Sequence, residues 1–279
     1  MTIVQAIILG FVQGLTEFLP VSSSAHLTLV GKAMGLISPE HPEAWTAFIA
    51  VIQLGTLLAV LVYFARDIAQ ISTAFLRDNL LERKPLKEQA LESKMGWFVI
   101  IGTLPIVTIG LALKKIIESS LTKDVTLIAW TLIVLAVVLF IAERVSKQLR
   151  GFEEITWRDA VIIGFAQTLA LFPGASRSGT TITAGLFTGL KRDVAARFSF
   201  LLSIPAVFAS GLLQLKQSLA FMNTQDLTTL LVATLVSGIS GYAAIALLLR
   251  YLQTHTTTVF VVYRIMLGVA LLTIWKTLF

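Results

Sequence analysis

A short polar segment occurs twice in this chain, each time inside a long apolar stretch. Residues 10–24 read GFVQGLTEFLPVSSS and residues 164–178 read GFAQTLALFPGASRS, and at an offset of 154 seven of the fifteen positions are identical. Both copies contain proline and hydroxyl groups, and each carries one charged residue, Glu17 or Arg177. Polar groups and irregular backbone at membrane depth are tolerated only where protein or a wet cavity surrounds them. The two segments therefore predict a central site formed by an internal repeat.

The composition is typical of an integral membrane protein. Of the 279 residues, 56% are hydrophobic and 14% are charged, and the mean hydropathy is +0.84, whereas soluble domains carry about 25% charged residues. The apolar runs are long enough for helices, so the expected fold is an all-α polytopic membrane protein. The absence of cysteine excludes disulfides and thiol chemistry. The pI near 9.7 fits basic cytoplasmic loops and anionic lipid, and no basic stripe with interleaved aromatic residues indicates a nucleic-acid partner.

The apolar pattern predicts about six full transmembrane helices and two re-entrant helical hairpins. The full spans are expected at residues 46–64, 96–113, 125–142, 194–213, 227–250 and 259–278. Residues 2–30 and 159–190 each have an apolar first half, a middle rich in Gly, Pro and Ser, and a second half too short to cross alone. We expect one membrane domain over residues 1–279, with repeat 1 at about 1–124 and repeat 2 at about 125–279.

Loop charges predict the orientation of the chain. If the segment 65–95, expected to be a solvated and partly helical connector, is cytoplasmic, that side carries thirteen Lys and Arg residues and the other side carries six. An excess of Lys and Arg marks the cytoplasm, so both termini should face outward. The first hairpin then opens outward and the second inward. The two repeats would therefore have inverted topology, with their hairpin tips meeting near the midplane.

The second copy contains the parts of a phosphate site. Proline and Gly174 end the incoming helix, and Ser176 or Ser178 can cap the next helix, whose free N–H groups then point at the break. Arg177 adds a bidentate fork for phosphate oxygens. The alternative is a capped turn in which Arg177 pairs with a structural carboxylate. Because an arginine at membrane depth costs about 2.5–3.5 kcal/mol, we favour phosphate binding.

The first copy supplies different groups. Gln13 and Glu17 lie four residues apart and share one helix face, and three serines precede His26. Glu17 has no basic neighbour in sequence, so its counter-charge must be Arg177 from the other copy or a bound divalent metal, for which Glu17 and Gln13 are the tentative ligands. A lone histidine is more often structural, but next to serines and a carboxylate His26 is a candidate proton carrier or nucleophile. Together these groups suit hydrolysis of a phosphoanhydride in lipid.

The segments QGLTEFLPVSSSAH and PGASRSGTT resemble the two motifs, (E/Q)xxxE and PGxSRSxxT, of the undecaprenyl-diphosphate phosphatases, the bacitracin-resistance family. The resemblance covers essentially the whole chain in length, hydropathy, motif order and motif distance. It implies a hydrolase of the bacterial cell (inner) membrane that removes the terminal phosphate of undecaprenyl diphosphate. Such an enzyme recycles the carrier lipid for peptidoglycan synthesis and confers bacitracin resistance. The resemblance further implies dependence on Mg²⁺ or Ca²⁺ and a site open to the periplasm.

Carried over by position, the resemblance assigns roles to individual residues. Glu17 is the second motif acid, Ser23 the proposed nucleophile and His26 its nearby histidine. Arg177 is the phosphate-binding arginine, and Ser176, Ser178 and Thr181 fall on the hydroxyl positions of the second motif. Gln13 replaces the first motif acid, and because an amide cannot act as a base, Glu17 remains the main acidic group. We predict that Ser23 attacks and His26 carries the proton; His26 itself or an activated water are the alternatives.

The sequence also bears on three alternatives to this function. Lipid phosphatases related to acid phosphatases carry a PSGH segment and a histidine that would fall on Thr183, so that class is excluded. A transporter that flips a polyprenyl phosphate on the same inverted repeat is the remaining alternative, with Glu17 coupling and Arg177 holding the anion. A purely structural protein would not need these two charges at depth. Gly238 and Gly241 permit close helix packing, within the chain or in a homodimer.

Overall fold

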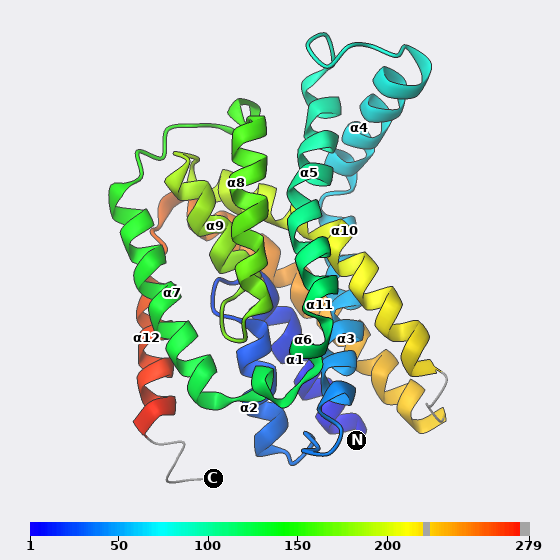
Figure 1. The fold of residues 1–279 in the computed structure, drawn as a ribbon, viewed down its shortest axis with the longest axis vertical. Helices are drawn as coiled ribbons and strands as arrows, with labels where there is room; N and C mark the ends of the chain where they lie inside the picture. The colour runs from blue at the N-terminus through cyan, green and yellow to red at the C-terminus, as the bar shows by residue number, and fades with distance from the viewer. Residues whose placement is uncertain (220–223, 274–279) are drawn as a thin grey trace.

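The computed structural model describes residues 1–219 and 224–273, and this part of the chain is helical (Figure 1). The α-helices are α1 Ile3–Phe18, α2 Ser23–Ala33, α3 Pro42–Tyr63, α4 Ala65–Leu76, α5 Leu91–Ala112, α6 Lys114–Glu118, α7 Val125–Val145, α8 Trp157–Gln167, α9 Arg177–Phe187, α10 Arg192–Leu219, α11 Thr224–Thr254 and α12 Thr258–Thr273. Shorter helical turns are Arg77–Leu81, Ser120–Lys123, Phe152–Glu154 and Thr168–Leu171. The described residues contain no strand beyond one isolated bridge between Arg150 and Leu190, so the predicted all-α class is confirmed.

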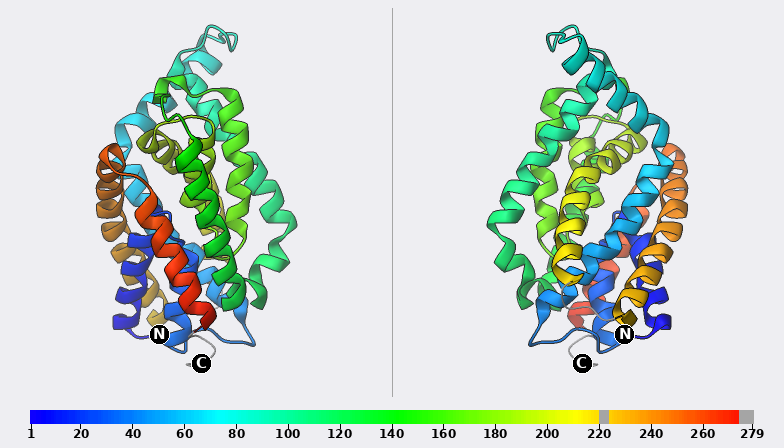
Figure 2. Two further views of the ribbon diagram at one scale, coloured as in Figure 1. Left: turned by 90° about the vertical axis from the view of Figure 1, so that its left-hand side faces the viewer. Right: turned by 90° about the vertical axis from the view of Figure 1, so that its right-hand side faces the viewer.

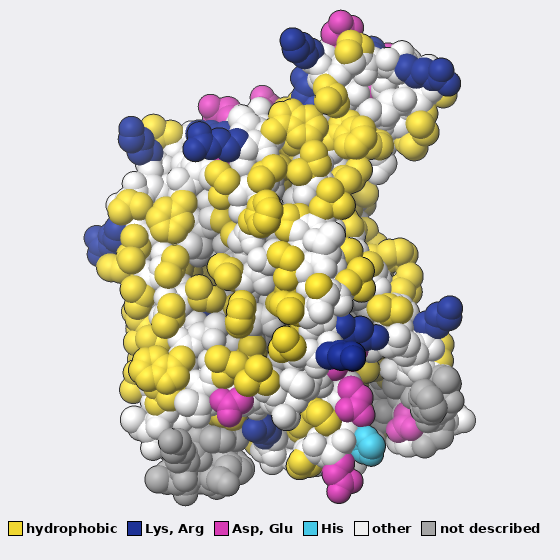
Figure 3. Space-filling view, viewed as in Figure 1, with side chains coloured by type: hydrophobic (Ala, Val, Ile, Leu, Met, Phe, Trp, Pro, Cys, Tyr) yellow, Lys and Arg dark blue, Asp and Glu magenta, His cyan; other side chains and the backbone are white. Residues whose placement is uncertain are grey.

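Five helices are long and apolar enough to cross a membrane: α3, α5, α7, α10 and α11. They coincide with five of the six predicted spans. The sixth prediction, 259–278, falls on α12, which ends at Thr273, and residues 274–278 lie outside the described residues. Apolar side chains cover the middle of the face seen in Figure 3, and charged side chains gather toward its two ends. The chain is a multi-pass membrane protein.

The two predicted hairpins are present as helix–break–helix units. At the offset of 154, α2 (Ser23–Ala33) and α9 (Arg177–Phe187) have equivalent bounds, and α1 and α8 begin at equivalent residues. In Figure 1 the α1–α2 hairpin enters from the end that holds both termini, and the α8–α9 hairpin enters from the opposite end. This is the arrangement that inverted repeats require. α7 packs against α9 and α12 (Figure 2), and all three lie within the predicted second repeat. The division of the chain into repeats near residue 125 stays a prediction.

Each break ends at a serine whose backbone is in a rarely used conformation. Ser22 and Ser176 have φ values of 75° and 67°, and their hydroxyl groups cap α2 and α9 by accepting hydrogen bonds from the N–H groups of Ala25 and Gly179. Non-glycine residues adopt positive φ infrequently, and such strain concentrates at functional sites. The capped turn makes the following residue, Ser23 in one hairpin and Arg177 in the other, the first residue of its helix.

The hairpins are held in place by closely packed helices. α1 packs along α11, and α8 packs along α5. The backbones of Gly164 and Gly102 meet so closely that a Cβ on Gly164 would lie 2.5 Å from the carbonyl oxygen of Gly102. Gly238 contacts the backbone of Gly55, and Gly241 contacts Phe18 and Thr56. Gly238 and Gly241, which the sequence assigned to packing either within the chain or in a homodimer, therefore pack within the chain.

The charged connector 65–95 is partly helical, as predicted. It forms α4 and the following π-helical turn, and Asp78 in that turn is fully buried. Asp78 accepts a hydrogen bond of 2.8 Å from the N–H of Ala90 and pairs with Arg77 and Lys84. The Ala90 hydrogen bond, followed by the neighbouring cations, lowers the pKa of Asp78. The carboxylate thus joins the π-helical turn to the backbone just before α5.

Candidate active site

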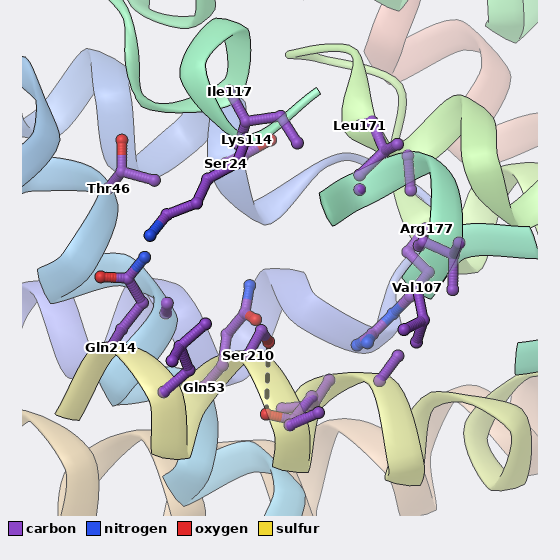
Figure 4. Close-up of a pocket in the computed structure, with 18 of the residues that line it drawn as sticks. Ser24, Thr46, Gln53, Val107, Lys114, Ile117, Leu171, Arg177, Ser210 and Gln214 are labelled. Carbon is purple, nitrogen blue, oxygen red and sulfur yellow. Dashed lines mark hydrogen bonds between the residues drawn. The ribbon is translucent and has the colours of Figure 1, made fainter. Parts of the chain in front are cut away.

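A cavity of about 380 Å³ lies where the two hairpin tips meet α3, α5 and α10 (Figure 4). The hairpin tips supply one part of its polar lining: Glu17, Ser23, Ser24, Ser176 and Arg177. Most of the remaining wall is apolar and comes from Ala50, Ile106, Val107, Gly110, Leu111, Ile117, Ala170, Leu171, Ala206, Val207, Ala209 and Leu213. The cavity therefore combines a charged, hydroxyl-rich surface with walls suited to hydrocarbon.

Two prolines precede the apolar walls. Pro105 lies inside α5 directly before Ile106 and Val107, and Pro205 lies inside α10 directly before lining residues of that helix. A proline inside a helix removes a backbone hydrogen bond and bends the helix. The backbone hydrogen bonding of α5 and α10 is thus interrupted where these helices line the cavity.

Glu17 is the centre of the polar network. Its Oε1 accepts a hydrogen bond from Nη2 of Arg177, which makes an ion pair between the two hairpins. Its Oε2 accepts from the Ser23 hydroxyl at 2.6 Å and from the Gln13 amide at 2.9 Å. Arg177 is one of the two partners that the sequence left open for Glu17, and it pairs with Glu17 here. The side chain of Glu17 is 3% exposed and that of Arg177 is 16% exposed, so the arginine presents the more accessible donors to the cavity.

The position of Ser23 favours attack on a phosphorus atom. Ser23 is the first residue of α2, and Arg177 is the first residue of α9, so two helix N-termini converge on the polar end of the cavity. Free N–H groups and the helix dipole at such ends stabilise negative charge. The Ser23 hydroxyl donates to a carboxylate, which is the arrangement of a nucleophile beside a proton acceptor.

His26 is not among the residues that line the cavity, and its role as a proton carrier stays a prediction. Its Nδ1 lies 2.7 Å from the carbonyl oxygen of Ser22, and its Nε2 lies 2.5 Å from the hydroxyl of Tyr263 on α12. A carbonyl can only accept, so Nδ1 carries the proton and Nε2 accepts from Tyr263. Both ring nitrogens are occupied away from Ser23. His26 thus contacts the break that precedes Ser23, and the Ser23 hydroxyl donates its hydrogen bond to Glu17.

Of the predicted residues in the second copy besides Arg177, only Ser176 lines the cavity, and Gly174, Ser178 and Thr181 do not. Ser178 donates to the carbonyl of Leu19 across the two breaks. Thr181 is buried and hydrogen bonds to the Arg177 carbonyl and to Ser199. Gly174 has φ 86° and packs against the backbone of Ile128. These three residues therefore fix the second break, and their polar groups are already used within the protein.

Arg264 is a functional candidate that the sequence motifs did not indicate. It lies on α12, is completely buried, and donates to the carbonyls of Pro20 in the first break and of Gly174 and Ala175 in the second. A fourth hydrogen bond reaches Leu132. One guanidinium thus satisfies backbone acceptors of both breaks at once. The signal was available, because an arginine in the middle of an apolar span is costly and marks a function.

The metal ligands proposed from sequence are Glu17 and Gln13. Among the described residues no group of three or more His, Asp or Glu side chains gathers to hold an ion. Gln13 Oε1 is nevertheless buried without a hydrogen-bond partner, beside the Glu17 carboxylate. Mg²⁺ is commonly held by one or two carboxylates while substrate phosphates supply other ligands. A small oxygen-ligand set of this kind fits a divalent cation that arrives with a phosphorylated substrate.

Comparison with known proteins identifies the family. The family model described as "Bacitracin resistance protein BacA" matches residues 6–270. The chain belongs to this family. It is 59% identical over 272 residues to the undecaprenyl-diphosphatase of Syntrophobacter fumaroxidans, covering 98% of this chain and 97% of that protein. It is 50% identical over 281 residues to the undecaprenyl-diphosphatase of Chloroherpeton thalassium (98% and 96% covered) and 49% identical over 277 residues to that of Myxococcus xanthus (99% and 90% covered). The predicted resemblance is confirmed.

Proposed function

We propose that this protein is an undecaprenyl-diphosphatase, an integral-membrane hydrolase that converts undecaprenyl diphosphate to undecaprenyl phosphate and inorganic phosphate. The single observation that carries the proposal is the hydrogen-bonded set Ser23–Glu17–Arg177 at the polar end of a largely apolar cavity. Membership of the family and full-length relatives of that name support it. In a bacterium this reaction recycles the carrier lipid for peptidoglycan synthesis and underlies bacitracin resistance.

The polar and apolar surfaces of the cavity can bind different parts of the substrate. The diphosphate meets Arg177 and the converging N-termini of α2 and α9, where charge-assisted hydrogen bonds are strongest. The first isoprene units lie along the apolar walls of α5 and α10, and the rest of the chain extends into lipid. Arg177 can turn from Glu17 to a phosphate oxygen, because its guanidinium offers several donors in a fixed fork.

Ser23 is the proposed nucleophile and Glu17 its proton acceptor. The Ser23 oxygen attacks the terminal phosphorus while its proton passes to Glu17 Oε2, to which it already donates at 2.6 Å. The bond from that phosphorus to the bridging oxygen breaks, and undecaprenyl phosphate leaves. Water then attacks the phosphorus of the phosphoserine, the bond from that phosphorus to the Ser23 oxygen breaks, and Glu17 returns its proton to this oxygen. Inorganic phosphate leaves, and both Ser23 and the Glu17 carboxylate are restored. Arg177 stabilises the charge on the transferring phosphoryl group.

A divalent cation, Mg²⁺ or Ca²⁺, is the proposed cofactor, with Glu17 and the unpartnered Gln13 Oε1 as its protein ligands. The charged residues that line the cavity are Glu17, Glu118, Lys114 and Arg177, and their formal charges cancel. A diphosphate would therefore bring negative charge that the lining leaves uncompensated. When bound, such a cation would supply that compensation and polarise phosphoryl oxygens.

We further propose that the protein lies in the bacterial inner membrane with its termini and cavity mouth toward the periplasm. The excess of Lys and Arg on the opposite side supports this orientation. The two hairpins are best described as parts of two inverted repeats, about 1–124 and about 125–279, within one membrane domain. Lipid is the expected partner; no surface of the described residues supports a particular oligomer.

The test is phosphate release from a long-chain isoprenyl diphosphate by purified protein in detergent, with Mg²⁺ or Ca²⁺ and with chelator. A hydrolase releases phosphate in detergent micelles, where no second compartment exists, and chelation should abolish the release. A polyprenyl-phosphate flippase on the same scaffold would release none from folded, monodisperse protein. In that case lipid movement across liposomes would be measured next.

A further inference from the structure

The outer end of the cavity carries a second polar cluster, separate from the Glu17 network. Lys114, Glu118, Gln214 and Thr46 line the cavity, and they come from the start and end of α6, the last part of α10 and the beginning of α3. These helix ends lie on the side of the molecule that holds both termini (Figure 1). Lys114 and Arg177 point into the same cavity from different sides, with Gln53 and Ser210 along its wall (Figure 4).

Lys123 anchors this cluster. It is 6% exposed and donates to the Thr46 hydroxyl at 2.6 Å and to the carbonyls of Glu118 and Ser119 at 3.1 and 2.9 Å. Carbonyls at the C-terminal end of a helix lack partners within the helix. One ammonium group therefore satisfies the end of α6 and joins it to α3. The anchor fixes α6, and with it both Lys114 and Glu118, at the mouth of the cavity.

Lys114 is held less firmly than its neighbours. Its Nζ lies 3.7 Å from Glu118 Oε1, a distance too long for a hydrogen bond, and Glu118 is its only charged partner among the described residues. The same carboxylate oxygen accepts a hydrogen bond of 3.1 Å from the Gln214 amide. Glu118 would therefore keep a partner if Lys114 turned away. The Lys114 side chain is 40% exposed and can move between the carboxylate and an anion in the cavity.

We propose that Lys114 is the cation of a second phosphate-binding position at the mouth of the cavity, and that Glu118 competes with phosphate for it. The phosphate belongs either to the arriving lipid diphosphate or to the inorganic phosphate that leaves. This inference rests on the proposed function of the deeper site. It adds a residue that binds substrate or product, while bond breaking takes place at Ser23 and Arg177.

The experiment compares Lys114→Gln, Glu118→Gln and Lys115→Gln with the unmodified protein. Lys115 is the matched control, because it adjoins Lys114 but is exposed and does not line the cavity. Hydrolysis kinetics give KM for the lipid diphosphate and the inhibition constant of inorganic phosphate. Phosphorus NMR line broadening of added phosphate gives binding in the absence of turnover.

Loss of one contact between a charged donor and phosphate should raise KM about tenfold in Lys114→Gln, with kcat within about twofold. Glu118→Gln should act in the opposite direction and lower KM, since Lys114 loses its competitor, and Lys115→Gln should change nothing. A raised KM alone identifies the lipid as the ligand, and a weakened phosphate inhibition alone identifies the product.

Unchanged constants in Lys114→Gln, or equal losses in Lys114→Gln and Glu118→Gln, would refute the proposal while leaving the diphosphatase intact. If the unmodified protein does not hydrolyse the lipid, the proposed function fails, and the NMR comparison still decides whether Lys114 binds phosphate.

Discussion

Replacing Arg264 by methionine tests whether one buried guanidinium holds both hairpin breaks. Methionine keeps a long, flexible apolar side chain but removes every donor. The carbonyls of Pro20, Gly174 and Ala175 would then lose hydrogen bonds of 3.1–3.3 Å in a completely buried place. Arg264 therefore stabilises the two breaks relative to one another, and its loss should weaken both the fold and the site.

The magnitude follows from the number of carbonyls left without a donor. Each buried, unsatisfied acceptor costs about 1–3 kcal/mol, and three are affected, but removing the buried charge returns part of this cost. We expect a net loss of roughly 3–5 kcal/mol, similar to the loss of one partner from a buried ion pair. At about 2–4 °C per kcal/mol for a chain of this size class, the melting temperature in detergent should fall by roughly 6–20 °C.

The assay is thermal unfolding of purified protein in detergent, with phosphate release measured well below the transition. Arg264→Lys should recover only part of the loss, because an ammonium has no planar fork with which to span the carbonyls of both breaks. Arg250→Met, at an exposed arginine near the end of α11, is the control and should unfold as the unmodified protein does. An Arg264→Met protein with an unchanged melting temperature and full activity would refute this account of the breaks.

Two further predictions concern Ser23, His26 and Lys123. Ser23→Ala should reduce phosphate release by several orders of magnitude, whereas His26→Gln should retain measurable turnover because His26 contacts the Ser22 carbonyl and Tyr263, not the cavity; equal losses in the two variants would restore His26 as the proton carrier. Burial lowers the pKa of Lys123 to about 8, against the weaker opposing effects of Glu118 and Glu43. Because the folded state then releases its proton before the unfolded state does, the stability of the protein relative to Lys123→Met should rise by about 1.4 kcal/mol per pH unit between about pH 8 and the ordinary lysine pKa of 10.5, and stay constant outside that range. A difference in melting temperature that does not change between pH 7 and pH 10 would contradict this.

The helical hairpins were predictable because their signals are local. Apolar length, proline and capping serines define where a helix begins and ends, and the offset of 154 reproduces the bounds of α2 and α9 residue for residue. The pairing of Glu17 with Arg177 was one of two alternatives, since a buried carboxylate in one repeat and a buried arginine in the other need counter-charges. The hairpins depend on local sequence signals, and the ion pair follows from the cost of unpaired charge in lipid.

Other parts of the site depend on packing that the sequence does not display. The direction of the His26 ring depends on Ser22 and on Tyr263, 237 residues away, and a contact over that sequence distance could not be predicted from the local motif. The cluster of Lys114, Glu118 and Gln214 forms only where the ends of three helices meet. Arg264 could have been identified from the sequence, because it lies within an apolar span. Its hydrogen bonds to the backbone of the two breaks could not.

The most direct test of the account is the effect of Arg177→Ala on metal-supported phosphate release from undecaprenyl diphosphate in detergent. Arg158→Ala, at an exposed arginine in the first turn of α8, serves as the control. The account predicts a loss of about 10²–10³-fold or more for Arg177→Ala, as for removal of a donor that stabilises transition-state charge, and incomplete recovery with Arg177→Lys. Near-normal release by folded Arg177→Ala protein would contradict the assignment of the active site to the two hairpin tips.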